Sequence, residues 1–144
     1  MGRVLEEGTR IAQIVLATIP TSTRVLIANA TAPCAVGVAQ ACRQLKRYGK
    51  NTVSVGQAAT PAARSEMLNP NSCLIGSVGF FPEKYGEQII PLVLKILAGE
   101  ATPPTAHIQH VYLHPENVAS YYPAWESVPS AAVIPTGTLP VTNP

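Results

Sequence analysis

Apolar and polar residues alternate along the chain in blocks whose spacing switches between that of a helix and that of a strand. The first block, residues 1–18, has helical spacing and predicts an amphipathic helix. Its expected buried side consists of Val4, Leu5, Ile11, Ile14 and Val15. Later blocks predict strands at 25–28, 52–55, 74–80 and 108–113, with helices at 33–49, 61–68 and 82–98 and a helical turn from 115. This order indicates an α/β fold in which flanking helices cover a parallel sheet.

The segment from Cys73 to Gly99, CLIGSVGFFPEKYGEQIIPLVLKILAG, organises the rest of the prediction. Small and apolar residues fill 74–80 and predict a strand buried on both faces. Pro82 suits the first turn of a helix, because its missing N–H would have no partner there. The helix that follows is apolar over far more than one stripe, so we expect it to be covered on more than one side. Pro91 inside it predicts a bend near 87–91.

Composition sets bounds on size and surface. The 144 residues, 15.2 kDa in mass, suit one domain with a real core. We place that domain at residues 1–123. Residues 124–144 contain four prolines and no periodic pattern, and we interpret them as a loose, proline-rich tail. Charged residues make up 12% of the chain, against a usual share of roughly 25%, so much of the surface is expected to be covered.

Candidate ligand-binding residues come from the loops that follow the predicted parallel strands, because ligands of such sheets bind outside the carboxyl ends of the strands. Three loops qualify, at 29–33, 57–61 and 80–82, and each leads into a helix whose free N–H groups can meet a polar ligand. They carry Asn29, Thr31, Gln57 and Thr60 as hydrogen-bonding residues, with Phe80 and Phe81 as flat apolar faces. This mixture suits a neutral, hydroxyl-rich molecule. The alternative is that these are ordinary capping and turn residues.

Several stretches resemble one known family. They are GSVGFFPEKYGEQIIPLVLKILAGEATPP followed by HPENVASYYP, the phrase TAPCAVGVAQA, and the loop VGQAATPAAR. They resemble the C-terminal part of type I periplasmic-binding-protein-like domains, which sugar-binding ABC-importer receptors share with lactose-repressor-type regulators. The likeness covers roughly residues 10–123 and implies one lobe of a two-lobed fold, with elements that cross the hinge. We therefore select Asn29, Thr31, Gln57, Phe80 and Phe81 as ligand-binding residues.

The resemblance implies a non-catalytic module that binds a sugar-like molecule for an ABC import system, without a cofactor. It places the protein in the periplasm or cell envelope and suggests an ABC permease as a partner. The alternative is the effector-binding domain of a lactose-repressor-type regulator, although the sequence shows no helix-turn-helix segment. Some polar residues that usually bind the sugar in this family are replaced here. Thr31 and Ala32 stand where an Asn-Asp pair is usual, and Ala58 stands where Asp or Asn is common. Phe80 stands at a hinge position that is often Gln.

Other chemistries lack recognisable parts. A net charge of +2 does not argue for nucleic acid, and the basic residues at 43–50 suit a helix C-terminus. His107 and His110 would point to opposite faces of a strand, which disfavours a metal site. Cys34 and Cys42 would lie about 12 Å apart on one helix, too far for a disulfide, so we interpret the three cysteines as core residues. The sequence shows no nucleophile–base pair, phosphate-binding loop or membrane span.

The matching residues begin near the middle of such proteins, so the resemblance also implies that most of the first lobe is missing from this sequence. In the family, the helix after the FFP turn packs on that lobe, which would explain its wide apolar surface. We expect the chain alone to aggregate, to self-associate or to need a partner chain that supplies the first lobe, and to bind solute weakly. Residues 1–18 do not have the pattern of a signal peptide.

Overall fold

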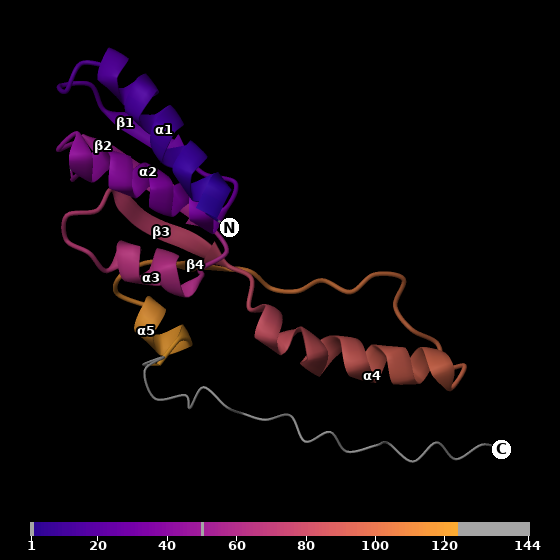
Figure 1. Ribbon diagram of the computed structural model, residues 1–144. Coiled ribbons are helices and arrows are strands. Elements are labelled where there is room, and N and C mark those ends of the chain that lie inside the picture. The colour runs from indigo at the N-terminus through magenta and orange to yellow at the C-terminus, as the bar shows by residue number, and fades with distance from the viewer. Residues whose placement is uncertain (1, 50, 124–144) are drawn as a thin grey trace.

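The computed structural model describes residues 2–49 and 51–123 (Figure 1). In chain order the elements are α1 (Gly2–Thr18), β1 (Val25–Ala28), α2 (Ala32–Gln44), β2 (Thr52–Gln57), α3 (Pro61–Met67), β3 (Leu74–Gly79), the 3-10 helix η1 (Pro82–Lys84), α4 (Tyr85–Leu97), β4 (Val111–Leu113) and α5 (Val118–Tyr121). The predicted order of elements is confirmed, with their ends shifted by a few residues. The tail predicted at 124–144 lies outside the described residues.

The four strands form one sheet in the order β1-β2-β3-β4. The first three run parallel, as the alternation of strands and helices predicts, with Val25 opposite Thr52 and Gln57 opposite Val78. β4 differs from the prediction, because it is antiparallel to β3 and much shorter than 108–113. The chain reaches β4 by returning from the far end of α4, and this return fixes the direction of the strand (Figure 1).

Three helices, α1, α2 and α3, form a layer over one face of the sheet (Figure 1). The central helix, α2, is buried along most of its length, including Ala35, Val38 and Cys42. Its Gly37 lets α1 come close, because a Cβ at this position would lie 2.2 Å from the Leu5 carbonyl oxygen. The two helices therefore meet through small residues and leave no room for larger side chains between them.

The buried side of α1 differs from the predicted one. The helix buries Gly8, Ala12 and Leu16. The predicted residues Val4, Ile11, Ile14 and Val15 are exposed, and Leu5 is half-buried. Small residues face α2 because the backbones approach so closely, and the large apolar residues are left to other surfaces. Three of them, Val4, Ile11 and Val15, line the groove described below.

The opposite face of the sheet has no helix over it among residues 2–49 and 51–123 (Figure 1). On the strands, Leu26 is 72% exposed and Ile75 is 42% exposed. α4, predicted to be covered, has no buried residue and projects away from the sheet. The prediction of a doubly buried strand is therefore wrong for the chain by itself, because the described residues supply no second helix layer. The exposed apolar surface of α4 agrees with the expectation for this helix in the absence of a first lobe. α4 continues through Pro91, and the bend expected there stays a prediction.

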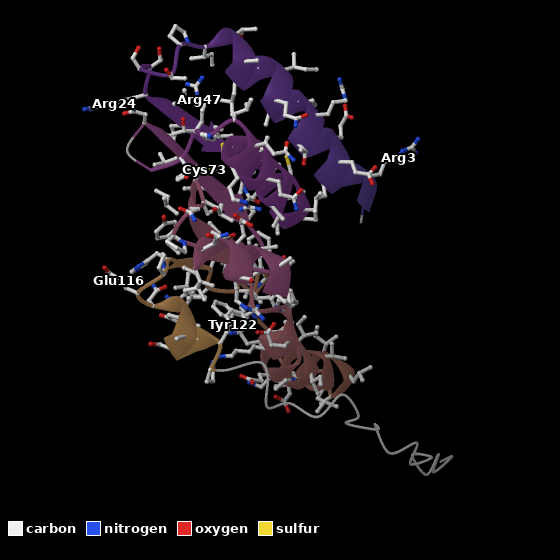
Figure 2. The ribbon with its side chains drawn as sticks, turned by 60° about the vertical axis from the view of Figure 1, so that its left-hand side comes forward. Arg3, Arg24, Arg47, Cys73, Glu116 and Tyr122 are labelled. Atoms are coloured by element: carbon white, nitrogen blue, oxygen red, sulfur yellow. The ribbon has the colours of Figure 1, made fainter. Side chains whose placement is uncertain are left out.

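Two arginines of the basic segment at 43–50 hold helices in place. The buried Arg47 (Figure 2) donates to the carbonyl oxygens of Leu16 (2.7 Å), Ile19 and Pro20 (3.0 Å) at the end of α1. The Leu16 carbonyl is among those that a helix end leaves without an i+4 partner, and the other two belong to the segment just after the helix. Arg43 pairs with Glu66 and joins α2 to α3.

Candidate functional site

The carboxyl ends of β1, β2 and β3 lie at one edge of the sheet, and the three predicted ligand loops follow them there. The Asn29 N–H donates to the Val55 carbonyl oxygen (3.0 Å), and the Ala58 N–H donates to the Val78 carbonyl oxygen (2.9 Å). Each loop therefore begins beside the neighbouring strand. The structure brings the three loops together at the edge where α/β sheets bind ligands.

The polar atoms of the first loop have partners inside the protein. Asn29 is 7% exposed, and its Nδ2 donates to Ser54 Oγ (2.7 Å) and to the Val55 carbonyl oxygen (2.9 Å). Its Oδ1 accepts from the Cys34 thiol (3.6 Å). Thr31 is exposed, and its hydroxyl accepts the Cys34 N–H (3.4 Å) as the N-cap of α2. Asn29 thus ties β1 to β2, while Thr31 both starts α2 and faces solvent.

The second loop begins at Gln57, which is exposed at the end of β2. Ala58, the next residue, has a φ of +61°, in the left-handed region that alanine rarely adopts. This conformation turns the chain from β2 towards α3, where the Thr60 hydroxyl accepts the Ala63 N–H (3.4 Å) as the N-cap. Gln57 therefore presents its amide to solvent beside a strained turn.

The two phenylalanines of the third loop have different surroundings. Phe80 is half-buried, and its ring centroid lies 4.7 Å from that of His110. Phe81 is 6% exposed, and its ring lies 5.6 Å from the rings of both Tyr121 and Tyr122. Phe81 also has a left-handed φ of +52°, which leads the chain from β3 into η1. Phe80 can offer part of its ring to a ligand, whereas Phe81 supports the loop from beneath.

A cluster that the sequence did not point to lies at the root of α4 (Figure 2, Tyr122). The Arg64 guanidinium carbon lies 3.9 Å from the centroid of the Tyr122 ring, and Arg64 Nη1 donates to the Ala59 carbonyl oxygen (2.7 Å). Partial burial and then the negative charge of Glu83 raise the pKa of the Tyr122 hydroxyl, while Arg64 opposes them. These residues come from α3, η1 and the end of α5, so no local motif could have revealed the cluster.

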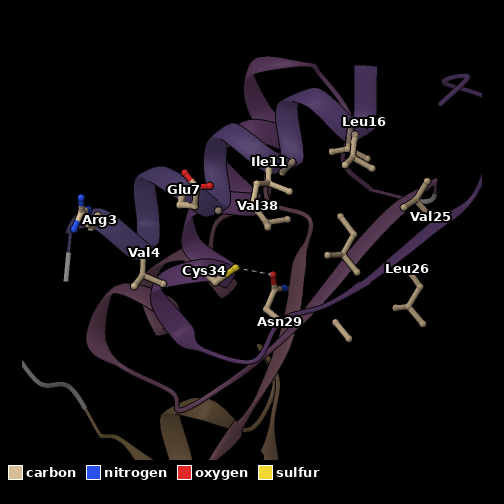
Figure 3. A pocket seen from close by; sticks show the side chains of 15 residues that line it. Arg3, Val4, Glu7, Ile11, Leu16, Val25, Leu26, Asn29, Cys34 and Val38 are labelled. Carbon is tan, nitrogen blue, oxygen red and sulfur yellow. Dashed lines mark hydrogen bonds between the residues drawn. The ribbon is translucent and has the colours of Figure 1, made fainter. Parts of the chain in front are cut away.

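The described residues also line a groove and a smaller cavity. A groove of about 760 Å³ runs between α1 and β1 and is lined mainly by apolar side chains (Figure 3). Asn29 and Cys34 stand on its wall, joined by the hydrogen bond drawn there. A smaller cavity of about 230 Å³ lies at the root of α4, beside Phe81, Gln88 and Tyr121. Within the described part of the chain, no three potential metal ligands gather, and no helix is long and apolar enough to span a membrane.

The cysteines lie where a core interpretation predicts, with one exception. Cys42 and Cys73 are fully buried, and Cys34 is half-buried on the groove wall. A hydrogen bond between Cys42 and Cys73, together with burial, raises the pKa of the Cys73 thiol. Cys42 and Cys73 therefore lie in the core, away from the residues that line the groove.

Comparisons with known proteins identify the fold. No protein-family model and no curated protein matches the chain significantly. Solved structures do match it. One is an ABC transporter solute binding protein from Agrobacterium vitis with bound allitol, at a TM-score of 0.72 and 18% identity, with 81% of this chain and 40% of that one covered.

Two further structures agree with this result. A glucose-galactose binding protein from Geobacillus stearothermophilus matches at a TM-score of 0.67 and 18% identity, covering 79% of this chain and 39% of that one. A solute binding protein from Bacillus halodurans with bound myo-inositol matches at a TM-score of 0.63 and 24% identity, covering 81% of this chain and 39% of that one. The chain thus spans about two fifths of the length of the proteins it resembles. The likeness expected from the sequence is confirmed, and the chain has the fold of one lobe of a type I periplasmic-binding-protein-like domain.

Proposed function

We propose that this chain supplies one lobe of a binding site for a sugar or sugar alcohol in an ABC import system. The observation that carries the proposal is the likeness to solute-binding proteins solved with allitol, D-allose and myo-inositol, combined with three loops at the edge where such a ligand would lie. The role is binding without catalysis, in the periplasm or cell envelope, with an ABC permease as the downstream partner.

The residues proposed to meet the solute are Thr31, Gln57 and Phe80. Thr31 and Gln57 are exposed and carry groups that can bond hydroxyls, and Phe80 keeps part of its ring accessible. Asn29 and Phe81 are buried and hold the loops in place. Asn29 fixes the first loop through its bonds to β2, and Phe81 fixes the third by packing against Tyr121 and Tyr122.

A second lobe is proposed to close over this surface and to pack against α4. The helix carries Ile89, Ile90, Val93, Leu94, Ile96 and Leu97, all exposed. An apolar surface of this size normally marks an interface. The single lobe should bind solute weakly: if the full site binds at 1 μM and half of the binding free energy is retained, the dissociation constant becomes about 1 mM.

The test is a titration of the purified chain with allitol, D-allose and myo-inositol, followed by amide chemical shifts in NMR spectra. We expect saturable shifts in the millimolar range, concentrated at the three loops. Gln57→Ala should weaken the binding by about tenfold if its amide bonds a hydroxyl. Gln44→Ala, a matched change of an exposed glutamine in the last turn of α2, should leave it unchanged. Shifts that occur elsewhere, or no shifts with any polyol, would disprove the proposed function.

A further inference from the structure

His110 lies directly before β4, on the segment that returns from α4 to the sheet. β4 pairs antiparallel with β3, and the last pair joins Gly79 to Val111. The same register, carried one residue further, sets His110 opposite Phe80. The ring contact agrees with this register, because the two ring centroids lie 4.7 Å apart at an interplanar angle of 46°. The return from α4 therefore brings an imidazole to the third candidate loop.

Phe80, His110 and Gln57 belong to one face of the sheet. Side chains along a strand alternate between the two faces, so Phe80 lies on the same face as Val78, two residues earlier. Gln57 pairs with Val78 in the register between β2 and β3, and paired residues point to the same face. His110 takes this face as the partner of Phe80. An amide, a phenyl ring and an imidazole therefore gather at the carboxyl ends of β2 and β3.

Tyr112 leaves this end of the sheet open. It is the partner of Val78 on β4 and so lies on the same face. Its ring lies over Gly76, towards the amino end of β3, because a Cβ at Gly76 would come within 2.1 Å of the Tyr112 hydroxyl oxygen. The Tyr112 ring thus turns away from Phe80 and His110. A ligand at the carboxyl ends of the strands can reach both rings, since His110 is exposed and Phe80 is half-buried.

The imidazole nitrogens of His110 are available to a ligand. Among residues 2–49 and 51–123, no residue forms a hydrogen bond or an ion pair with either nitrogen. An imidazole carries a donor nitrogen in both protonation states and an acceptor nitrogen when it is neutral. A hydroxyl group both donates and accepts, so it can bond to either nitrogen. The C–H face of a polyol can therefore rest on Phe80 while one of its hydroxyls bonds to His110.

We propose that His110 binds a hydroxyl of the solute, next to the C–H face that rests on Phe80. This inference rests on the proposed function, and it adds a residue of the return segment to those of the three loops. It also narrows the class of solute, which must carry a hydroxyl within about 3 Å of the imidazole and C–H groups beside it. An imidazole that only covered Phe80 would need no nitrogen, so its replacement by a phenyl ring separates the two roles.

The test compares His110→Phe with the unchanged chain in NMR titrations with allitol, D-allose and myo-inositol. The phenyl ring can still pack on Phe80 but cannot bond a hydroxyl. For the polyol that the unchanged chain binds most tightly, we expect the dissociation constant to rise about five- to tenfold. His107→Phe makes the same change at an exposed histidine of the same segment, about 10 Å further from β4 along an extended chain, and binding should be unchanged.

A second readout follows the imidazole itself. In the unchanged chain, the ring nitrogen signals of His110 should shift with polyol concentration along the same saturation curve as the loop amides. Signals that stay in place while a polyol binds would overturn the inference, and so would equal binding by His110→Phe. In both cases the proposed function would stand, and His110 would serve only to cover Phe80 or to contact a second lobe. If the unchanged chain binds none of the polyols, the proposed function fails and this inference fails with it.

Discussion

Arg47 is the residue whose replacement tests the arrangement of the helix layer most directly. Its guanidinium is buried and bonds three carbonyl oxygens at and just beyond the last turn of α1. Arg47→Met keeps the aliphatic stem and removes all three bonds. We expect the variant to fold, to lose stability, and to fray at the end of α1, because that end would lose its anchor to the segment after α2.

The loss of stability in Arg47→Met depends on which hydrogen bonds each carbonyl oxygen still accepts. Leu16 and Pro20 still accept the N–H groups of Ile19 (3.3 Å) and Thr23 (3.0 Å). Among residues 2–49 and 51–123, the Ile19 carbonyl oxygen accepts a hydrogen bond from Arg47 alone, so in the variant it must bond to water or stay without a donor. Bonds to a charged donor contribute about 1.5–3 kcal/mol each when their loss is complete. With two carbonyls still paired, we expect a total loss of about 3 kcal/mol.

Urea unfolding followed by circular dichroism measures this loss, and hydrogen exchange locates it. The exchange rates of amides near residues 16–19 should rise more than those of α2. Lys46→Met is the control, since Lys46 is exposed and its removal should change stability by less than about 0.5 kcal/mol. A loss below about 1 kcal/mol for Arg47→Met would refute the view that this arginine anchors α1.

Three other predictions follow from the site and from α4. Ala58→Gly should stabilise the fold by about 0.5–1 kcal/mol in urea unfolding, because relief of the left-handed strain exceeds the entropy cost of glycine, whereas Ala62→Gly within α3 should destabilise it by a similar amount. Leu94→Glu should lower the mass of self-associated chain in light scattering, and Leu68→Glu, an exposed apolar residue outside α4, should not. Since folding raises the pKa of Tyr122, the unfolding free energy should be unaffected by this group below about pH 10 and should fall as the pH rises through the folded-state value. Tyr122→Phe should remove that part of the decline, and an identical pH profile in the variant would contradict the assignment.

The sequence predicted the elements well where the pattern is local. Pro61 after Thr60 starts α3 as expected, and the parallel order of β1, β2 and β3 follows from the helices between them. The direction of β4 depends on where the chain returns from α4, which no local pattern encodes. The predicted buried side of α1 is wrong because it follows side-chain size, whereas the close approach of the helices at Gly37 selects small residues.

The sequence predicts where the three candidate loops lie, but it does not predict which of their side chains are exposed and which bond inside the protein. The rule for strand ends located the loops, and hydrogen bonds at Asn29 and Ala58 confirm that they lie together. Nothing in the sequence indicates that the Asn29 side chain donates a hydrogen bond to Ser54, or that the Phe81 ring is buried against Tyr122. The partners of Phe81 lie about forty residues further along the chain, so its role depends on how β4 and α5 return to the loop.

The groove and the solute loops are connected through Asn29. This residue lies at the carboxyl end of β1, bonds to β2, and also stands on the groove wall beside Cys34 (Figure 3). Asn29 therefore links the first of the three loops to the wall of the groove.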